Sequence, residues 1–215
     1  MKMLHGWQFP DHELHLPQWM EHAKNQVVLN GRIAYQGRKQ LAARQRCKKM
    51  RVAVDVGGHI GLWSFNLANW FETVHAFEPV AEHRECFVEN VRDSNVCLHA
   101  LALGAEPGMV SMATEQGSSG NTTVAGAGDI EMVTLDSFGL REVDFIKIDC
   151  EGYEENVLKG ARETISECKP VIIVEQKRDM ATRFGLQMLG AVEFLTDMGY
   201  KVAEEISGDY IMVPA

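Results

Sequence analysis

The sequence lacks any apolar run that approaches the roughly 20 residues needed to cross a bilayer, so we expect no membrane association. Its opening segment, MKMLHGWQFPDHELHLP, carries charges, histidines and prolines where a signal peptide would have an apolar core. We find no internal repeat and no extended low-complexity segment. These absences predict a globular protein that stays in the cytoplasm.

Cysteine is sparse and irregularly spaced. The five cysteines stand at positions 47, 86, 97, 150 and 168, and no two of them have CxxC spacing. A disulfide framework uses an even number of cysteines, and zinc sites use closely spaced pairs. We therefore predict reduced thiols. Cys150 lies in an acidic segment, and we interpret it as a small buried side chain rather than as a nucleophile.

Positive charge is in the minority. The chain has 21 Lys and Arg against 30 Asp and Glu, which gives a net charge of −9 and a pI near 5.4. An acidic surface repels phosphate backbones, so we expect no nucleic-acid partner. One segment departs from this balance, because residues 38–51 hold seven Lys or Arg in fourteen positions. We interpret it as a solvated helix with scattered basic residues.

The chain divides into two regions of different composition. Its 215 residues suit one sizeable domain with a short extension. Residues 1–50 are rich in His, Gln, Arg and Lys, and we predict a helical N-terminal extension or lid there, with helices over 18–28 and 39–49. Three aromatic residues in this region, Trp7, Trp19 and Tyr35, form either a lid over an acceptor or packing contacts with the domain.

Residues 51–215 alternate regularly between strand and helix patterns, which predicts one domain. Apolar β-branched runs predict strands over residues 51–56, 73–77, 95–101, 143–148 and 170–174. Further strands are expected over 104–114 and 129–135, around the polar loop GSSGNTTVAGAG, and a helix over 182–198. The runs 200–204 and 210–213 lie only about five residues apart, too few for a crossover helix, so they must be antiparallel. This pattern predicts an α/β fold whose mostly parallel sheet has a C-terminal antiparallel strand and helices on both faces.

A glycine turn, VDVGGHIG, follows the first strand of this domain, where a doubly wound sheet binds its ligand. Gly57 and Gly58 permit a tight turn, and Gly61 lets the next helix pack closely. A GxGxxG dinucleotide motif ending at Gly61 would need glycine at position 56, which is Val56. The turn therefore departs from the dinucleotide pattern.

Two carboxylates accompany the turn. Asp55 precedes it in the spacing D-x-G-x-x-x-G, and an acid there suits a cationic ligand such as S-adenosylmethionine better than a pyrophosphate. Glu78 ends the second strand, where a carboxylate can accept hydrogen bonds from ribose hydroxyls. His59, inside the turn, either contacts a ligand or points to solvent.

An acidic cluster follows the strand in FIKIDCEGYE. Asp149 ends that strand, Glu151 and Glu154 follow it, and Glu175 ends the next strand. These two strands should be neighbours in a parallel sheet, so their carboxylates should face the same crevice. Glu154 stands near a helix N-terminus, where capping explains it.

Three roles suit Asp149, Glu151 and Glu175. One of them acts as a general base toward a hydroxyl, they bind sugar hydroxyls, or they hold a divalent metal. We favour the first two roles together and predict no metal. The predicted donor-binding residues are Asp55, Gly57, Gly58, His59, Gly61, Glu78 and Asp149.

The combined motifs resemble a known family. The resemblance lies in VDVGGHIGLWS, AFEP, LALG followed by glycine, VTLDSF, FIKIDCEGYEENVLKGA and VIIVEQ, spread over residues 51–177. These segments are similar to those of the FkbM-type methyltransferases. The resemblance implies a Rossmann-like class I methyltransferase fold, S-adenosylmethionine as donor, and methylation of a hydroxyl on a sugar or secondary metabolite. It also makes Asn121, with Glu151 and Glu175, a candidate for acceptor binding.

Two other functions compete with methyl transfer. A nucleotide-dependent oxidoreductase is disfavoured by Asp55 and Val56. A cofactor-binding protein without catalysis is disfavoured by the acidic cluster. His12 and His15, three residues apart in HELH, lack further ligands at metal-binding spacing. Neither the acceptor nor the oligomeric state follows from the sequence.

Overall fold

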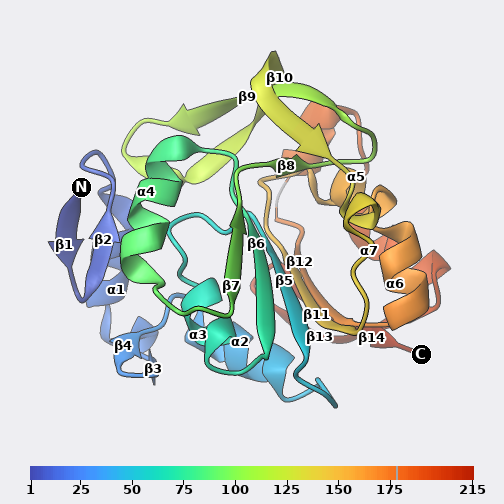
Figure 1. The fold of residues 1–215 in the computed structure, drawn as a ribbon, viewed down its shortest axis with the longest axis horizontal. Coiled ribbons are helices and arrows are strands. Elements are labelled where there is room, and N and C mark those ends of the chain that lie inside the picture. Colours follow the sequence, from blue (N-terminus) through green and yellow to red (C-terminus); the bar gives the residue numbers. More distant parts are fainter. Residues whose placement is uncertain (178) are drawn as a thin grey trace.

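The computed structural model describes residues 1–177 and 179–215, and its centre is a seven-stranded sheet (Figure 1). The strand order is β13-β14-β12-β11-β5-β6-β7. Their bounds are β5 Val52–Val56, β6 Thr73–Phe77, β7 Val96–His99, β11 Val143–Ile148, β12 Val171–Glu175, β13 Tyr200–Ile206 and β14 Asp209–Pro214. The chain builds outward from β5 to β7 and then continues at β11 on the other side of β5. This reversal makes a switch point between β5 and β11, where such sheets bind ligands.

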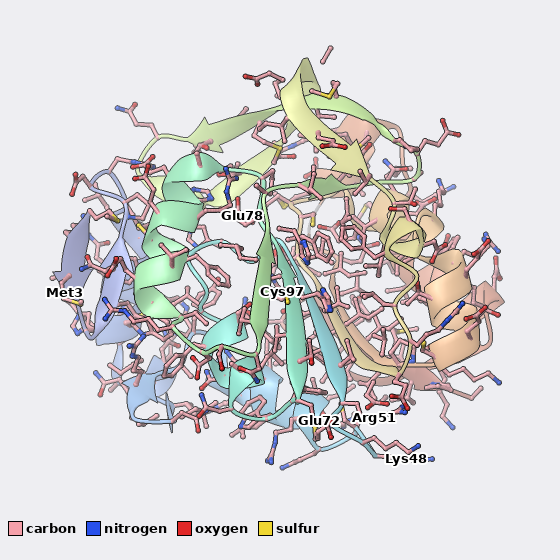
Figure 2. All side chains as sticks on the ribbon, viewed as in Figure 1. Met3, Lys48, Arg51, Glu72, Glu78 and Cys97 are labelled. Atoms are coloured by element: carbon pink, nitrogen blue, oxygen red, sulfur yellow. The ribbon has the colours of Figure 1, made fainter. Side chains whose placement is uncertain are left out.

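The sheet is mixed in the way that the strand spacing predicts. Strands β5, β6, β7, β11 and β12 pair in parallel, whereas β14 runs antiparallel to both β12 and β13. Figure 2 shows Arg51 and Glu72 at one end of the sheet and Glu78 at the other. The carboxyl ends of the parallel strands therefore meet at the Glu78 end.

Helices cover both faces because successive side chains of a buried strand point to opposite sides. On one face, apolar residues of the strands pack against α5 (Glu154–Lys159), α6 (Arg162–Cys168) and α7 (Gly190–Asp197); they are Val54, Val56, Ile146, Ile148, Ile172 and Val174. On the other face, Ala53, Phe145 and Ile173 pack with residues of α2 (Gly37–Arg44) and α3 (Ser64–Ala68). The helix α4 (Ala81–Asn90) lies beside β6 and β7 (Figure 1).

One predicted helix is divided. The expected helix over 182–198 consists of the 3-10 helix η3 (Met180–Phe184) and α7, with an irregular stretch between them. Gly185 has φ +69°, outside the helical region, so the backbone cannot continue as one helix. The apolar spacing extends through this break, which explains the wrong prediction.

The predicted polar loop is instead part of a long strand. β10 (Ser118–Val133) pairs with β9 (Gly108–Glu115) and, at its end, with β8 (Ala102–Leu103). Its pairing with β9 shifts register three times, which accommodates the Gly/Ser/Thr composition as bulges. This three-stranded sheet lies across the carboxyl ends of the central strands (Figure 1).

The N-terminal region is only partly helical, contrary to the prediction. It contains two hairpins, β1 (Lys2–Leu4) with β2 (Trp7–Phe9) and β3 (Val28–Leu29) with β4 (Arg32–Ile33), and the helices α1 (His15–Glu21), η1 (Ala23–Asn25) and α2. Trp7 is fully buried with Ile60 and Leu62, and its indole donates to the Ile33 carbonyl over 2.9 Å. It is a core residue and not part of a lid.

The helices also bear on the expectation about membranes. Within residues 1–177 and 179–215, none of them combines the length and the apolar character required of a bilayer-spanning segment.

Candidate active site

The glycine turn after β5 is held closely against the neighbouring strands. The amides of Gly57 and Gly58 donate to the Phe77 carbonyl over 3.0 and 2.9 Å. Gly57 has φ +72°, and a Cβ there would collide with the Asp149 carbonyl oxygen. A Cβ on Gly61 would collide with Val91. Gly61 thus leaves room for the end of α4 rather than for the helix that follows it in the chain, and it lines neither of the two cavities described below, although it was predicted to bind the donor.

Glu78 lies where β6 ends, with 4% of its surface exposed. Its carboxylate accepts hydrogen bonds from the His59 amide (2.7 Å), the Val80 amide (2.8 Å) and His83 Nδ1 (3.2 Å). A carboxylate offers about four lone-pair directions, so it can also accept from a ribose hydroxyl. Glu78 therefore fixes the glycine turn and faces the cavity beside it.

That cavity is small and mainly apolar. It has a volume of about 60 Å³ and is lined mainly by apolar side chains, including Phe77, Pro79, Leu101, Leu103, Met112 and Tyr153. This is below the roughly 300 Å³ typical of small-molecule sites. Binding of a nucleoside therefore requires the cavity to widen, and the β9–β10 hairpin forms one of its walls through Ser119 and Gly120.

Asp55 does not face either cavity, contrary to its predicted contact with the donor. It is fully buried beneath the glycine turn, where it accepts from Ser64 Oγ (2.6 Å) and pairs with Lys147 Nζ (3.2 Å). Its side chain points to the α3 side of the sheet because it shares the face of Ala53 in the alternating strand.

Lys147 is a site residue that sequence reasoning missed. Only 5% exposed, it donates to the carbonyls of Val56 (3.1 Å) and Gly57 (2.7 Å) and so supports the turn from below. Its ammonium also borders the larger cavity. The available signal was a lysine in the middle of the otherwise apolar strand FIKI.

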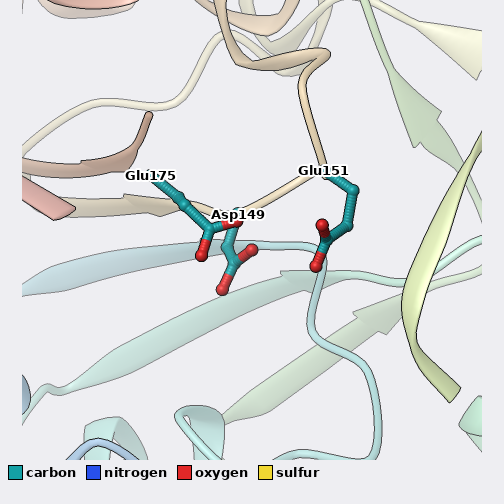
Figure 3. A group of neighbouring side chains, drawn as sticks. All are labelled: Asp149, Glu151 and Glu175. Atoms are coloured by element: carbon teal, nitrogen blue, oxygen red, sulfur yellow. The ribbon is translucent and has the colours of Figure 1, made fainter. Parts of the chain in front are cut away.

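The structure brings the three predicted carboxylates together. Asp149, Glu151 and Glu175 point toward one another from the ends of β11 and β12 (Figure 3), and each offers an oxygen within 4.8 Å of the others. They line a cavity of about 350 Å³, and its other lining residues include Gly57, Gly58, His59 and Asn121. Glu154 stays apart and accepts from the amides of Cys150 and Gly152, so it holds the turn before α5 and does not cap the helix as the sequence suggests.

The three carboxylates titrate differently. Burial and the neighbouring Asp149 raise the pKa of Glu151 to about 8 and that of Glu175 to about 9. Burial opposes ionisation of Asp149 as well, but Lys147 and Lys177 outweigh it and lower the pKa of Asp149. At neutral pH the cluster therefore has an ionised Asp149 beside two protonated glutamic acids.

These pKa values predict how stability depends on pH. From pH 4.5 to about 9 the folded protein retains protons on Glu151 and Glu175 that the unfolded chain releases. Their contribution to the free energy of unfolding is complete below pH 4.5 and decreases as the pH rises through this range. Urea denaturation across the range should show a smaller decrease for Glu175→Gln than for the wild type or for Glu85→Gln, an exposed control. Equal pH dependence in all three would contradict these assignments.

The N-terminal region completes the site wall. His15, Leu16 and Tyr35 line the larger cavity, and the Tyr35 ring packs edge-on against Trp19 with centroids 4.9 Å apart. The buried carboxylate of Glu13 accepts from the amide and the hydroxyl of Ser119, each over 2.6 Å. Sequence reasoning missed this link because nothing local connects two residues 106 positions apart.

Through Ser119, this link reaches the glycine turn. The Ser119 hydroxyl proton is engaged by Glu13, so His59 Nε2, 2.8 Å from Ser119 Oγ, must be the donor in that bond. Burial, with His83 and Lys147 nearby, lowers the pKa of His59 and keeps its ring neutral. His59 thus lies between the two cavities, with its Nδ1 as an acceptor.

A divalent metal is one group that the carboxylate cluster could bind, because hard oxygen ligands at this spacing suit Mg²⁺. However, Lys177 Nζ already contacts the Glu175 carboxylate and supplies positive charge. The expectation of a site without metal stays a prediction.

Comparison with known proteins shows which family the sequence belongs to. Residues 55–202 match the Methyltransferase FkbM domain. Methyltransferase FkbM from Methylobacillus flagellatus KT shares 20% identity at a TM-score of 0.50, covering 76% of this chain but only 43% of that one. The chain thus spans less than half the length of that structure. No curated protein matches the chain.

Two further solved structures share the fold. Precorrin-6y C5,15-methyltransferase from Geobacter metallireducens GS-15 shows 17% identity and a TM-score of 0.52 over 88% of this chain and 92% of that one. The protein SMU.1697c from Streptococcus mutans, in complex with SAH, shows 9% identity and a TM-score of 0.51 over 82% and 94% of the two chains. The domain match covers more than half of the sequence. The chain therefore belongs to the FkbM methyltransferase family, whose members use S-adenosylmethionine.

Proposed function

We propose that this protein is an O-methyltransferase that transfers a methyl group from S-adenosylmethionine to a hydroxyl of a small acceptor, a sugar, glycan or secondary metabolite. One observation supports it most. Three carboxylates converge in a cavity of about 350 Å³ that shares Gly57, His59 and Asp149 with the cavity beside Glu78. An acceptor hydroxyl in the first cavity would lie next to a donor in the second.

The residues present fit the donor. Glu78 supplies acceptors for ribose hydroxyls, the apolar wall suits a purine ring, and the ionised Asp149 suits a sulfonium. When bound, S-adenosylmethionine supplies a methyl carbon on a positively charged sulfur that leaves as a thioether. The expected contribution of the protein is alignment of the hydroxyl and exclusion of water.

Asp149 is the proposed base because it is the ionised member of the cluster. Its carboxylate takes the proton of the acceptor hydroxyl as the oxygen lone pair forms the bond to the methyl carbon. The protonated Glu151 and Glu175 donate hydrogen bonds to neighbouring acceptor oxygens, and Asn121 adds an amide at the rim of the same cavity. Because the protonated Glu151 and Glu175 carry no charge, the cavity repels the developing alkoxide less than three carboxylates would.

An acceptor screen tests this function. Incubation with radiolabelled S-adenosylmethionine and panels of sugars, polyketides and phenols should label at least one hydroxyl, with the product identified as a methyl ether by mass spectrometry. Transfer to nitrogen or carbon alone would contradict the assignment to oxygen. The expectation that nucleic acid is not an acceptor stays a prediction, which an RNA sample in the same panel checks.

Glu78→Gln is expected to weaken binding of S-adenosylhomocysteine. Loss of charge-assisted hydrogen bonds to the ribose should raise the dissociation constant about 10- to 100-fold. Titration calorimetry measures it, with the exposed Glu85→Gln on α4 as the matched control. Unchanged affinity in a Glu78→Gln protein that melts like the wild type would remove Glu78 from the donor site.

A further inference from the structure

A third hollow adjoins the carboxylate cavity. It has a volume of about 760 Å³ and lies between the α1–η1 segment, the first turn of α2 and the turn that joins β13 to β14. His15, Tyr35 and Lys177 line both hollows, so the two lie side by side. None of the residues that line it is assigned to donor binding or to proton transfer. We refer to it as the cationic groove.

The cationic groove carries the charge opposite to that of the whole protein. Its lining includes Lys24, Arg38, Lys39 and Lys177, and no Asp or Glu is among the described residues that line it. Lys39 and Lys177 both pair with Asp209 (2.8 and 3.3 Å), and Lys177 also contacts the carboxyl group of Glu175. Lys24 and Arg38 are exposed and form no ion pair with any residue in 1–177 or 179–215. Two cations are thus available to a ligand on a protein of net charge −9.

We propose that the acceptor carries a phosphate-type anion, which binds in the cationic groove while the hydroxyl to be methylated lies among Asp149, Glu151 and Glu175. This inference rests on the proposed function and narrows its acceptor to a phosphorylated or nucleotide-linked polyol. The carboxylate cavity and the cationic groove have opposite charges, and this fixes the orientation of the acceptor. The ionised Asp149 repels the anion, and the cations of the groove attract it. Trp19 and Tyr35 line the cationic groove, and Tyr35 also lines the carboxylate cavity, so both rings are placed to contact a sugar or base.

The charge distribution favours a small anionic acceptor over a nucleic-acid strand. A strand needs a run of cations along its backbone, because each neutralised phosphate contributes to affinity. The groove offers two available cations and ends at the carboxylate cavity. Of the seven basic residues in 38–51, only Arg38 and Lys39 line the groove, and Lys39, Arg46 and Arg51 pair with carboxylates of the fold, so the segment does not form a continuous phosphate track.

Titration calorimetry with matched probes tests the inference. The wild type, saturated with S-adenosylhomocysteine, is titrated with glucose, UDP-glucose, inorganic pyrophosphate and a short single-stranded RNA. The same titrations use the double variant Lys24→Ala/Arg38→Ala and a control, Lys201→Ala, at the far end of β13. Binding of S-adenosylhomocysteine by each protein is measured first, and it reports on donor binding independently of the groove.

We expect UDP-glucose and pyrophosphate to bind the wild type and Lys201→Ala, with glucose much weaker. The double variant should bind both phosphate probes about tenfold more weakly or worse, and raised salt should reduce the difference. Equal binding by all three proteins, or no preference for the phosphate probes, would overturn the inference while leaving donor binding intact. Tighter binding of RNA than of UDP-glucose through Lys24 and Arg38 would overturn the choice of a small acceptor. If the wild type itself does not bind S-adenosylhomocysteine, the proposed function is refuted instead.

Discussion

Replacement of Asp149 by Asn is expected to lower kcat about 10²- to 10⁴-fold, the usual contribution of a positioned general base. The change keeps the size of the side chain and removes the only carboxylate of the cluster that is ionised at neutral pH. Affinity for S-adenosylhomocysteine should change far less, because Glu78 and the glycine turn are untouched. A steady-state methyl-transfer assay, with the acceptor found by the screen, measures both kcat and KM.

The control for this variant is Asp129→Asn, an exposed position on β10. It removes the same charge without touching the cavity, and its turnover should equal that of the wild type. Circular dichroism and a thermal melt show whether each protein is folded. A folded Asp149→Asn enzyme with undiminished turnover would remove Asp149 from proton transfer and leave Glu151 or Glu175 as the base.

Replacement of Asp55 by Asn should destabilise the fold by about 3–5 kcal/mol, the usual cost of leaving one partner of a buried ion pair uncompensated. Asp55 has no exposed surface and Lys147 has 5%, so the remaining ammonium loses its buried partner and has little contact with water in its place. Because Lys147 also holds the carbonyls of Val56 and Gly57, the glycine turn should loosen as well. Urea denaturation measures the change in the free energy of unfolding.

A second substitution separates this pair from direct ligand contact. The double variant Asp55→Asn/Lys147→Met removes both charges and should recover much of the lost stability, because no buried charge remains unpaired. If Asp55→Asn alone unfolds at the wild-type urea concentration but fails to bind S-adenosylhomocysteine, Asp55 contacts the donor directly and the structural role is wrong.

The sequence predicts the frame of the site because the relevant signals are local. Apolar runs mark the strands, and the carboxyl ends of parallel neighbours meet, so the convergence of Asp149 and Glu175 follows from strand order alone. The need for glycine at position 57 follows likewise from a turn after a buried strand, and the structure adds that the Asp149 carbonyl leaves no room for a Cβ.

Other features depend on information that is not local. The sequence of a strand buried on both faces does not reveal which face a given side chain takes. The sequence therefore predicts a contact between Asp55 and the donor, whereas the structure pairs Asp55 with Lys147. The contact between Glu13 and Ser119 joins segments 106 residues apart. The Gly/Ser/Thr segment of β10 has the composition of a loop, but pairing with β9 makes it a strand.

The N-terminal region shows the same limit. Its composition suggests helices over 18–28 and 39–49, whereas the structure has the shorter helices α1, η1 and α2 together with two hairpins, the first of which buries Trp7 and Phe9. Helix propensity is a weak prior that tertiary packing overrides. The lining of the larger cavity by His15 and Tyr35 likewise arises only once the region has packed against the domain.

A crystal structure of the protein with S-adenosylhomocysteine tests the central claim most directly. We predict the ribose hydroxyls on the Glu78 carboxylate, the sulfur beside Asp149, and a displaced Ser119–Gly120 wall where the small cavity widens. A nucleoside bound elsewhere would contradict the account. A nucleoside in this cavity whose ribose does not contact Glu78 and whose sulfur lies away from Asp149 would contradict it as well.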